Sequence, residues 1–290
     1  MERTPPTTAA GLGIALFASL LTLPSAVAAT SLEELRERGH IRVAVADEVP
    51  YGYLDAEGEG RGAGPDVARP LLERLGIERI EWQVVDFEDL IPGLEHGEFD
   101  MAAAEMAIRP ERCNRVLFSE PNTSYGEGLL VQAANPHEIT AYDHFVARDD
   151  IRVAVLAGAT QVDILATMGV PEDRLVVIDT NAQAIDTILD GSADAYAGTG
   201  LTVSQLAEQD TRVEVAQNFV DPEVEGELVR SWGGFAFSPG AESLRDAFNE
   251  ALLDYRNTGA WEETLSGHGF TQDDILNAFR FDTEWLCSRQ

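Results

Sequence analysis

The sequence predicts an α/β fold built of two lobes. Short apolar runs with strand character alternate with segments of helical period, which is typical of largely parallel sheets covered by helices. The alternation restarts after residues 128–131, and a second series of similar length follows. The 290 residues are enough for two compact units, since a domain usually contains on the order of 100 to 200 residues.

The first elements are an export signal and its cleavage site. Residues 12–23 are uncharged and apolar but too few for a comfortable membrane span of roughly 20 residues, and residues 26–28 fit a small-x-small cleavage site. We therefore expect residues 1–28 to be a signal peptide and the mature protein to be periplasmic or extracellular. Because Glu2 lies beside Arg3, the positive charge before the apolar run is weak, and an uncleaved anchor is the alternative.

The next elements form the first α/β series. Ser31 and Glu34 have capping-box spacing and predict a short helix that ends at Gly39. Residues 47–53 form a Pro- and Gly-rich loop after the first strand, where functional side chains often lie. Pro70 is expected to kink the helix that contains it. The expected strands are 41–45, 80–85 and 99–104, and the expected longer helices are 65–75 and 87–95.

The second series has the same pattern and is followed by helices that have no sheet of their own. Its expected strands are 128–131, 151–156, 175–178, 193–197 and 213–216, and its expected helices are 136–148, 158–169, 182–189 and 201–209. A strand at 234–237 precedes helical patterns at 242–255, 261–265 and 273–279. We expect these last helices to pack on the first lobe, so that the second lobe is an insertion. The predicted lobes are residues 29–130 with 236–290, and residues 131–235, joined by two crossover strands that form a hinge beside a cleft.

The composition excludes several classes of partner. The chain has 51 acidic residues, 20 basic residues that are all Arg, and a formal net charge of -31. Such a surface repels nucleic acid and anionic membranes, so neither is expected to bind. Concentrated salt screens the self-repulsion, since the Debye length falls to about 3 Å at 1 M, and we interpret the acidity as adaptation to a salty exterior. A GC-rich genome with an acidic bias is the alternative.

Arg112 is the candidate anchor of a ligand. It follows an apolar strand, on a turn that Pro110 stiffens, where a guanidinium can hold a carboxylate by two parallel charge-assisted hydrogen bonds. A surface arginine in a Pro-initiated turn is the other interpretation. The five histidines show no metal-ligand spacing, and no phosphate loop or nucleophile elbow occurs, so we expect neither metal nor cofactor.

Cys113 and Cys287 are the two cysteines of the chain. An exported chain with an even number of cysteines favours one disulfide, which would tie the C-terminal tail to the turn that carries Arg112. Closing so long a loop contributes about 4 to 5 kcal/mol in the chain-entropy model. Two unpaired buried thiols are the alternative.

Several motifs along the mature chain resemble those of the family 3 periplasmic solute-binding proteins of ABC importers. The matching segments are residues 39–45, 109–112, 118–121, 191–195 and 257–261. The resemblance implies a type II two-lobe fold that closes on a small polar solute, with the membrane permease of the importer as partner. We expect a monomer.

A narrower resemblance connects residues 110–113, residues 194–199 and the C-terminal cysteine with the ectoine/hydroxyectoine-binding subunits of this family. Amino-acid binders usually carry an Asp for the ligand's α-ammonium where this chain has Thr199. A delocalised ring amidinium needs an aromatic face more than a point carboxylate at that place. One departure is the lack of a Phe that the ectoine binders place near Ala107.

The resemblance implies a small zwitterionic ligand and a set of six binding residues. Arg112 would take the carboxylate, and Thr160 with the amides that open its helix would form a second anion site. Tyr51 and Phe87 would stack on the cation, at about 0.5 to 2 kcal/mol each, and Glu48 would accept the ring N–H groups. Thr199 completes the set.

Each of these residues also has a structural interpretation. Thr160 can be a helix cap, Phe87 and Tyr51 ordinary core, Glu48 a solvated loop acid and Thr199 a strand-end hydroxyl. The predicted function is binding of ectoine or hydroxyectoine for import, and a polar or zwitterionic amino acid is the alternative ligand. A third interpretation is a cyclohexadienyl dehydratase-like enzyme on the same fold, with Glu48 or Glu105 as its carboxylate.

Overall fold

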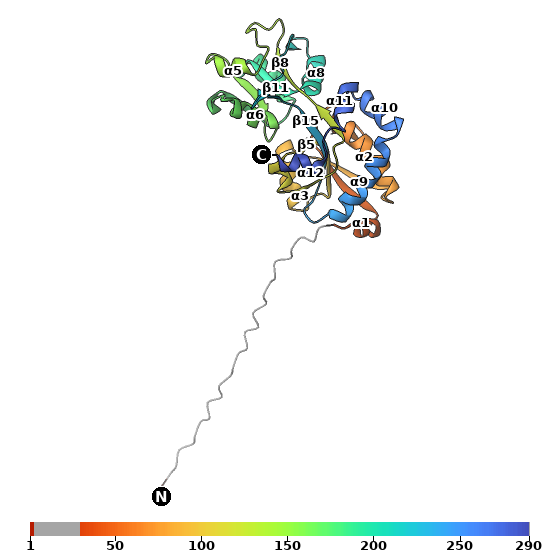
Figure 1. Cartoon of the computed structure of the whole chain (residues 1–290). Helices are drawn as coiled ribbons and strands as arrows, with labels where there is room; N and C mark the ends of the chain where they lie inside the picture. Colours follow the sequence, from red (N-terminus) through yellow and green to blue (C-terminus); the bar gives the residue numbers. More distant parts are fainter. Residues whose placement is uncertain (3–29, 290) are drawn as a thin grey trace.

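The computed structural model, which describes residues 1–2 and 30–289, shows two α/β lobes (Figure 1). Each lobe has one main sheet with helices on its faces, so the predicted fold class is confirmed. The expected signal peptide, residues 1–28, lies outside the described residues except for its first two. Within the described ranges, no helix has the length and apolar character needed to cross a membrane.

The first lobe is built on a six-stranded sheet. In spatial order its strands are β4 (Arg79–Val84), β1 (His40–Val45), β5 (Met101–Ala107), β15 (Ser231–Phe237) and β6 (Leu117–Phe118), with β7 (Thr123–Tyr125) also paired to β15. β4, β1 and β5 are parallel, whereas β15 is antiparallel to its neighbours. Parallel strands bring their carboxyl ends to one edge, which is where open α/β sheets bind ligands.

Helices cover both faces of this sheet (Figure 1). Ser31 and Glu34 form the predicted capping box at the start of α1, and Gly39 ends this helix in the left-handed conformation, with φ of 75°. Phe248 and Trp261, from two C-terminal helices, share one apolar core with the first sheet. The helices are α1 (Leu32–Arg38), α2 (Ala63–Arg74), α3 (Leu90–Glu95) after the 3-10 turn η1 (Phe87–Asp89), α4 (Pro110–Cys113), α9 (Glu242–Arg256), α10 (Gly259–Gly267), α11 (Gln272–Asn277) and α12 (Thr283–Ser288).

The second lobe is built on a five-stranded sheet. In spatial order its strands are β10 (Leu175–Ile178), β9 (Val153–Leu156), β11 (Ala195–Thr199), β8 (Glu127–Gln132) and β12 (Val213–Val215), of which β10, β9 and β11 are parallel. Its helices are α5 (Asp143–Ala147), α6 (Thr160–Met168), α7 (Gln183–Leu189) and α8 (Gly200–Gln209), with the 3-10 turn η2 (Glu172–Arg174). Two short hairpins complete the chain, β2 (Tyr53–Leu54) with β3 (Gly60–Arg61), and β13 (Glu223–Val224) with β14 (Glu227–Leu228).

The chain passes between the two sheets twice. It leaves the first sheet after β7 and enters the second with β8, so that Gly126 lies between them. It returns after the β13–β14 hairpin, when β15 joins the first sheet. The lobe boundaries expected at residues 130 and 235 fall inside β8 and β15, and the division of the chain at these residues stays a prediction.

One expected helix is much shorter than the sequence predicts. In place of a helix over 136–148, only Asp143–Ala147 is helical. The Asn135 side chain accepts a hydrogen bond from the Ile139 N–H at 2.9 Å and donates one to the Ile139 carbonyl at 2.9 Å. Glu138 has a positive φ of 53°. Because Asn side chains compete for backbone groups in this way, the segment forms a closed loop instead of a helix.

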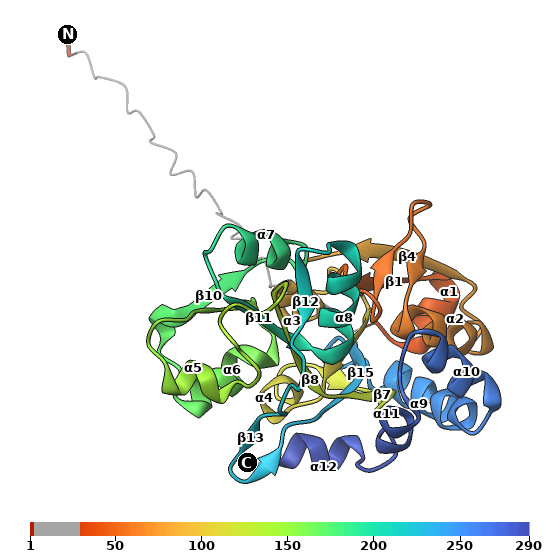
Figure 2. The same ribbon diagram turned by 90° about the horizontal axis from the view of Figure 1, so that it is seen from above.

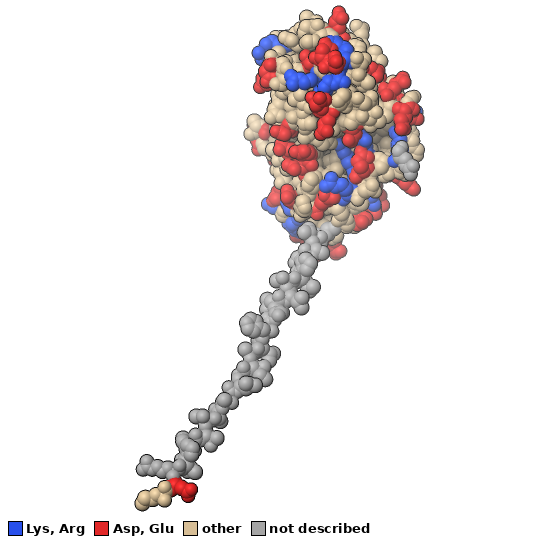
Figure 3. Space-filling model, turned by 90° about the vertical axis from the view of Figure 1, so that its left-hand side faces the viewer, with Lys and Arg blue, Asp and Glu red and all other residues tan. Residues whose placement is uncertain are grey.

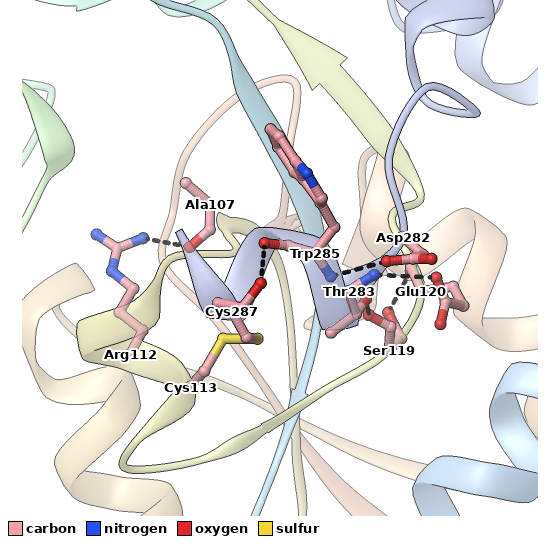
Figure 4. The surroundings of a disulfide bond; sticks show 10 residues. Ala107, Arg112, Cys113, Ser119, Glu120, Asp282, Thr283, Trp285 and Cys287 are labelled. Atoms are coloured by element: carbon pink, nitrogen blue, oxygen red, sulfur yellow. Dashed lines mark hydrogen bonds between the residues drawn. A yellow bond between two sulfur atoms is a disulfide. The ribbon is translucent and has the colours of Figure 1, made fainter. Parts of the chain in front are cut away.

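The predicted disulfide joins Cys113 and Cys287, with a Cα–Cα distance of 5.7 Å. Figure 4 shows that it ties α12 to the short helix α4, while Arg112 on α4 points away from the bond. The Thr283 hydroxyl donates to the Ser119 carbonyl at 2.6 Å and further holds α12 in place. Figure 2 shows α12 beside the β13–β14 hairpin, where Arg289 and Glu227 form an ion pair at 3.0 Å.

The acidic residues are spread over the surface. On the face shown in Figure 3, Asp and Glu side chains occur on both lobes, with Arg side chains between them. Dispersed charges of one sign repel each other weakly at high salt and more strongly at low salt.

The disulfide should contribute strongly to stability. Replacing both cysteines by Ser removes a cross-link between residues 174 positions apart. We expect the free energy of unfolding, measured by urea denaturation, to fall by about 2 to 5 kcal/mol, because the unfolded chain gains conformational freedom. An unchanged denaturation midpoint would contradict this assignment, and the single Cys287→Ser variant should behave like the double variant.

Candidate functional site

A pocket lies between the two lobes, at the carboxyl ends of their parallel strands. Its empty volume is about 420 Å³, part of which is open to solvent. All six residues predicted from the sequence line it: Glu48, Tyr51, Phe87, Arg112, Thr160 and Thr199.

A tight turn after β1 carries Glu48 and Tyr51. The backbone N–H groups of Glu48 and Gly52 donate to each other's carbonyls at 3.0 and 2.8 Å. The N–H of Gly64 in α2 donates to the Tyr51 carbonyl at 2.9 Å. A Cβ on Gly64 would lie 2.5 Å from the Ala103 carbonyl oxygen, so only glycine lets α2 approach β5 this closely. The turn is therefore fixed between α2 and the first sheet.

Arg112 is a buried cation that contacts both lobes. It lies on α4 with Pro110 in the first turn, and only 8% of the residue is exposed. Its guanidinium donates to the Ala107 carbonyl of the first lobe at 3.0 Å and to the Gly158 carbonyl of the second lobe at 2.9 Å. The guanidinium carbon lies 5.6 Å from the centroid of the Phe87 ring.

No carboxylate among the described residues forms an ion pair with Arg112, although its neighbours Arg109 and Arg115 are both paired. Burial lowers the pKa of Arg112, since desolvation penalises the charged form. A buried guanidinium that donates only to carbonyls keeps its full positive charge, so the pocket favours an anionic group beside it.

Aromatic rings form much of the remaining wall. Phe87 opens η1 and is half-buried, whereas Tyr51 and Tyr125 are buried and pack edge to face with their centroids 5.1 Å apart. Tyr196 lies on β11 of the second lobe and lines the same pocket. A Cβ on Gly198 would lie 2.8 Å from the Tyr196 ring, so Gly198 provides the space that this ring occupies.

Thr160 and Thr199 lie at the starts of two helices of the second lobe. Thr160 is the first residue of α6 and is buried, but Ala159 is the N-cap residue, so Thr160 is not a plain cap. Thr199 is the N-cap of α8, where its hydroxyl accepts from the Thr202 N–H at 3.2 Å. It also accepts from the Tyr51 hydroxyl, across the cleft, at 2.8 Å.

Glu48 receives a hydrogen bond from the second lobe. The Thr202 hydroxyl donates to its Oε1 at 2.7 Å. Burial raises the pKa of Glu48, and hydrogen bonds from Thr202 and Asn181 oppose that rise because they favour the ionised form. Glu48 is thus held within the pocket and is not a freely solvated loop acid.

Two further carboxylates are buried near the connections between the lobes. Glu105 lines the pocket and accepts from Asn122 and Thr123, at 2.7 Å each. Glu127 accepts from Gln161 at 2.6 Å through one oxygen, while its Oε1 has no hydrogen-bond partner in the part of the chain that the structure describes. Burial raises the pKa of each carboxyl to about 7.

Three pocket residues with polar side chains, Tyr125, Gln161 and Tyr196, were given no role from the sequence. Tyr196 lies in the segment 194–199, which resembles the ectoine-binding subunits. Tyr196 and Gly198 are two residues apart on one strand and therefore share a face, which could have indicated that the ring lies over the glycine. Tyr125 and Gln161 had no such signal. Among the described residues, no group of three or more His, Cys, Asp or Glu side chains is arranged to hold a metal ion.

Comparison with known proteins identifies the family and the fold. Residues 41–269 match the bacterial extracellular solute-binding proteins, family 3. A probable amino-acid ABC transporter periplasmic-binding protein of Sinorhizobium fredii is 43% identical over 277 residues, which cover 95% of this chain and 92% of that protein.

Two solved structures extend the comparison. EhuB in complex with hydroxyectoine superposes with a TM-score of 0.81 at 31% identity, covering 89% of this chain and 98% of EhuB. AncCDT-1, described as an ancestral amino-acid-binding protein and a precursor of cyclohexadienyl dehydratase, has a TM-score of 0.69 at 26% identity, with coverage of 81% and 98%. The predicted type II two-lobe fold and the resemblance seen in the sequence are both confirmed.

Glu127 should make stability depend on pH. Its folded-state pKa of about 7 is above its ordinary value of 4.5, so the folded protein holds a proton that the unfolded chain has lost. The contribution to stability is therefore present at low pH and is lost as pH rises from about 4.5 to about 7. We expect Glu127→Gln to reduce this fall in the urea denaturation midpoint. The exposed control Glu223→Gln should retain it, and equal slopes in both variants would contradict the assignment.

Proposed function

The chain belongs to the bacterial extracellular solute-binding proteins, family 3, and we propose that it is the subunit of an ABC importer that binds ectoine or hydroxyectoine. The likeness to EhuB in complex with hydroxyectoine supports this ligand. The Sinorhizobium fredii relative, described as a periplasmic-binding protein of an ABC transporter, supports the role in an importer. The proposed partners are the small zwitterionic solute and the membrane permease, and the proposed location is the periplasm or the cell exterior.

The observation that carries the proposal is the buried guanidinium of Arg112, which has no carboxylate partner among the described residues and lies beside aromatic rings. A compact zwitterion with a carboxylate and a delocalised amidinium ring has the complementary chemistry. Its carboxylate would replace water at Arg112, and its cationic ring would lie against Tyr51 and Phe87, where each cation–π contact is worth about 0.5 to 2 kcal/mol. Glu48 would accept the ring N–H groups.

Tyr196 would supply the third ring of this site. The sequence has Ala107 near the place where the ectoine binders carry a Phe, and Ala107 lines the pocket without an aromatic side chain. Tyr196 enters the same pocket from the second lobe over Gly198. We propose that this ring replaces the missing wall and packs on the solute only when the two lobes are together.

A zwitterionic amino acid is the second candidate ligand. Glu48 and Glu105 both line the pocket, and the Sinorhizobium fredii relative is described as a probable amino-acid binder. Thr199 argues against an α-ammonium site at the end of β11, because a hydroxyl brings no compensating charge. For the enzyme alternative, both oxygens of Glu105 accept hydrogen bonds from its own lobe, as a structural carboxylate does.

The acidic surface supports a salty exterior as the working environment. A net charge of -31 destabilises a compact chain most when salt is scarce. Compatible solutes are useful where external salt is high, so the surface and the proposed ligand favour the same setting.

Calorimetric titration with ectoine, hydroxyectoine, glycine betaine, glutamate and arginine tests the proposal. We expect one of the two ectoines to bind at micromolar concentration or below, because the pocket complements both the carboxylate and the cationic ring. Micromolar binding of glutamate or arginine without any heat from the ectoines would overturn the proposed ligand and leave the family assignment unchanged.

Two arginine variants give the matched control for that titration. Arg112→Gln removes the proposed carboxylate partner, and we expect affinity for the bound ectoine to fall at least about 30-fold, as for the loss of a buried charge pair. Arg115→Gln removes an exposed arginine that pairs with Glu95 on the same lobe, and affinity should not change. Equal affinities in the two variants would show that Arg112 does not hold the ligand.

A further inference from the structure

We propose that Thr202, which does not line the pocket, is a positioning residue that joins the second lobe to the first through a relay of hydroxyl groups. The relay runs from Tyr51 through Thr199 and Thr202 to Glu48, and it fixes both ends of the turn at residues 48–52. The inference deepens the proposed function, because Tyr51 and Glu48 are proposed ligand contacts.

Three short contacts define the relay. The Tyr51 hydroxyl lies 2.8 Å from Thr199 Oγ1, Thr199 Oγ1 lies 2.9 Å from Thr202 Oγ1, and Thr202 Oγ1 lies 2.7 Å from Glu48 Oε1. Tyr51 and Glu48 belong to the first lobe. In the second lobe, Thr199 is the N-cap of α8 and Thr202 lies in its first turn. The relay therefore crosses the cleft twice.

The number of protons fixes the direction of these hydrogen bonds. A hydroxyl has one proton to donate and two lone pairs to accept with. Thr199 Oγ1 uses both lone pairs, since it accepts from the Tyr51 hydroxyl and from the Thr202 N–H. Its own proton must then go to Thr202 Oγ1, and the Thr202 proton goes to the Glu48 carboxylate. Every donor in the relay thus points toward the Glu48 carboxyl group.

In this arrangement neither threonine donates a hydrogen bond to the ligand. The single proton of Thr199 is already used, so Thr199 has none to give to a bound solute. Thr202 is only 2% exposed and reaches the ligand site through Glu48. Because the Thr202 hydroxyl is the last link before the carboxylate, its removal takes one hydrogen-bond donor from Glu48 and leaves only the Tyr51–Thr199 bond of the relay between the turn and α8.

The relay and Arg112 are two separate contacts between the lobes. Arg112 reaches the Gly158 carbonyl before α6, while the relay joins the turn after β1 to the start of α8. These direct bonds favour the closed arrangement of the lobes whether or not a solute is bound. A solute that contacts Arg112 and Glu48 would then bind to a site whose geometry is already fixed, which lowers the entropic cost of binding.

Two substitutions of Thr202 and one control test the relay. Thr202→Val keeps the shape of the side chain and removes the hydroxyl, and Thr202→Ser keeps the hydroxyl. Ser204→Ala is the control, because Ser204 lies on the same helix and its hydroxyl donates only to the Gly200 carbonyl, at 2.8 Å. The separation of the lobes is measured by fluorescence transfer between one dye on α5 and one on α9, first without added solute and then with ectoine.

We expect Thr202→Val to increase the lobe separation without added solute and to weaken ectoine binding about 10-fold or more, the usual effect of losing a hydrogen bond to a charged group. Thr202→Ser and Ser204→Ala should match the wild type. An unchanged lobe separation and affinity in Thr202→Val would overturn the relay, as would failure of Thr202→Ser to restore them. If the wild type does not bind ectoine but Thr202→Val still opens the lobes, the relay is supported and the proposed ligand is wrong.

A double-mutant cycle separates the relay from a purely structural role of Thr202. Tyr51→Phe removes the first hydroxyl of the relay and keeps the ring. If both residues act through one relay, the combined variant should open the lobes less than the sum of the two single effects. Strictly additive effects would overturn the proposal.

Discussion

The burial of the Arg112 guanidinium, which pairs with no carboxylate within residues 1–2 and 30–289, is the constraint on which the rest of the structure depends. A charge removed from water costs several kcal/mol unless it is paired or hydrogen-bonded. Arg112 offsets part of this cost through two carbonyls and the face of Phe87, yet none of these groups carries a formal negative charge. The pocket therefore keeps an unneutralised cation in the cleft, and a solute with a carboxylate can neutralise it.

The surrounding structure fixes the position of that cation. Arg112 lies on a helix of only four residues, which has little stability of its own. Pro110 opens this helix, and the disulfide from Cys113 joins it to α12 (Figure 4). Contacts far apart in the sequence thus stabilise a short element, and the guanidinium donates to one carbonyl from each lobe. The same contacts couple the ligand site to the arrangement of the lobes.

The sequence predicts those parts of the molecule that depend on local chemistry. The capping box at Ser31 and the Pro110 turn could be predicted because their hydrogen bonds or backbone restraints involve neighbours in the chain. The prediction of a helix over 136–148 was wrong for a similarly local reason. The Asn135 side chain forms hydrogen bonds with the backbone of Ile139 and closes a loop. Tyr125 and Thr202 were missed because their partners, Tyr51 and Glu48, are far away in the sequence. The first pair exists only after the first lobe has folded, and the second only after the two lobes have met.

The most direct test of this account is a crystal structure of the protein with ectoine. Two hydrogen bonds from the Arg112 guanidinium to the ectoine carboxylate are the predicted result, with the ring of the solute between Tyr51, Phe87 and Tyr196. A complex in which Arg112 still donates only to the carbonyls of Ala107 and Gly158, while the ligand carboxylate lies elsewhere, would contradict the central claim.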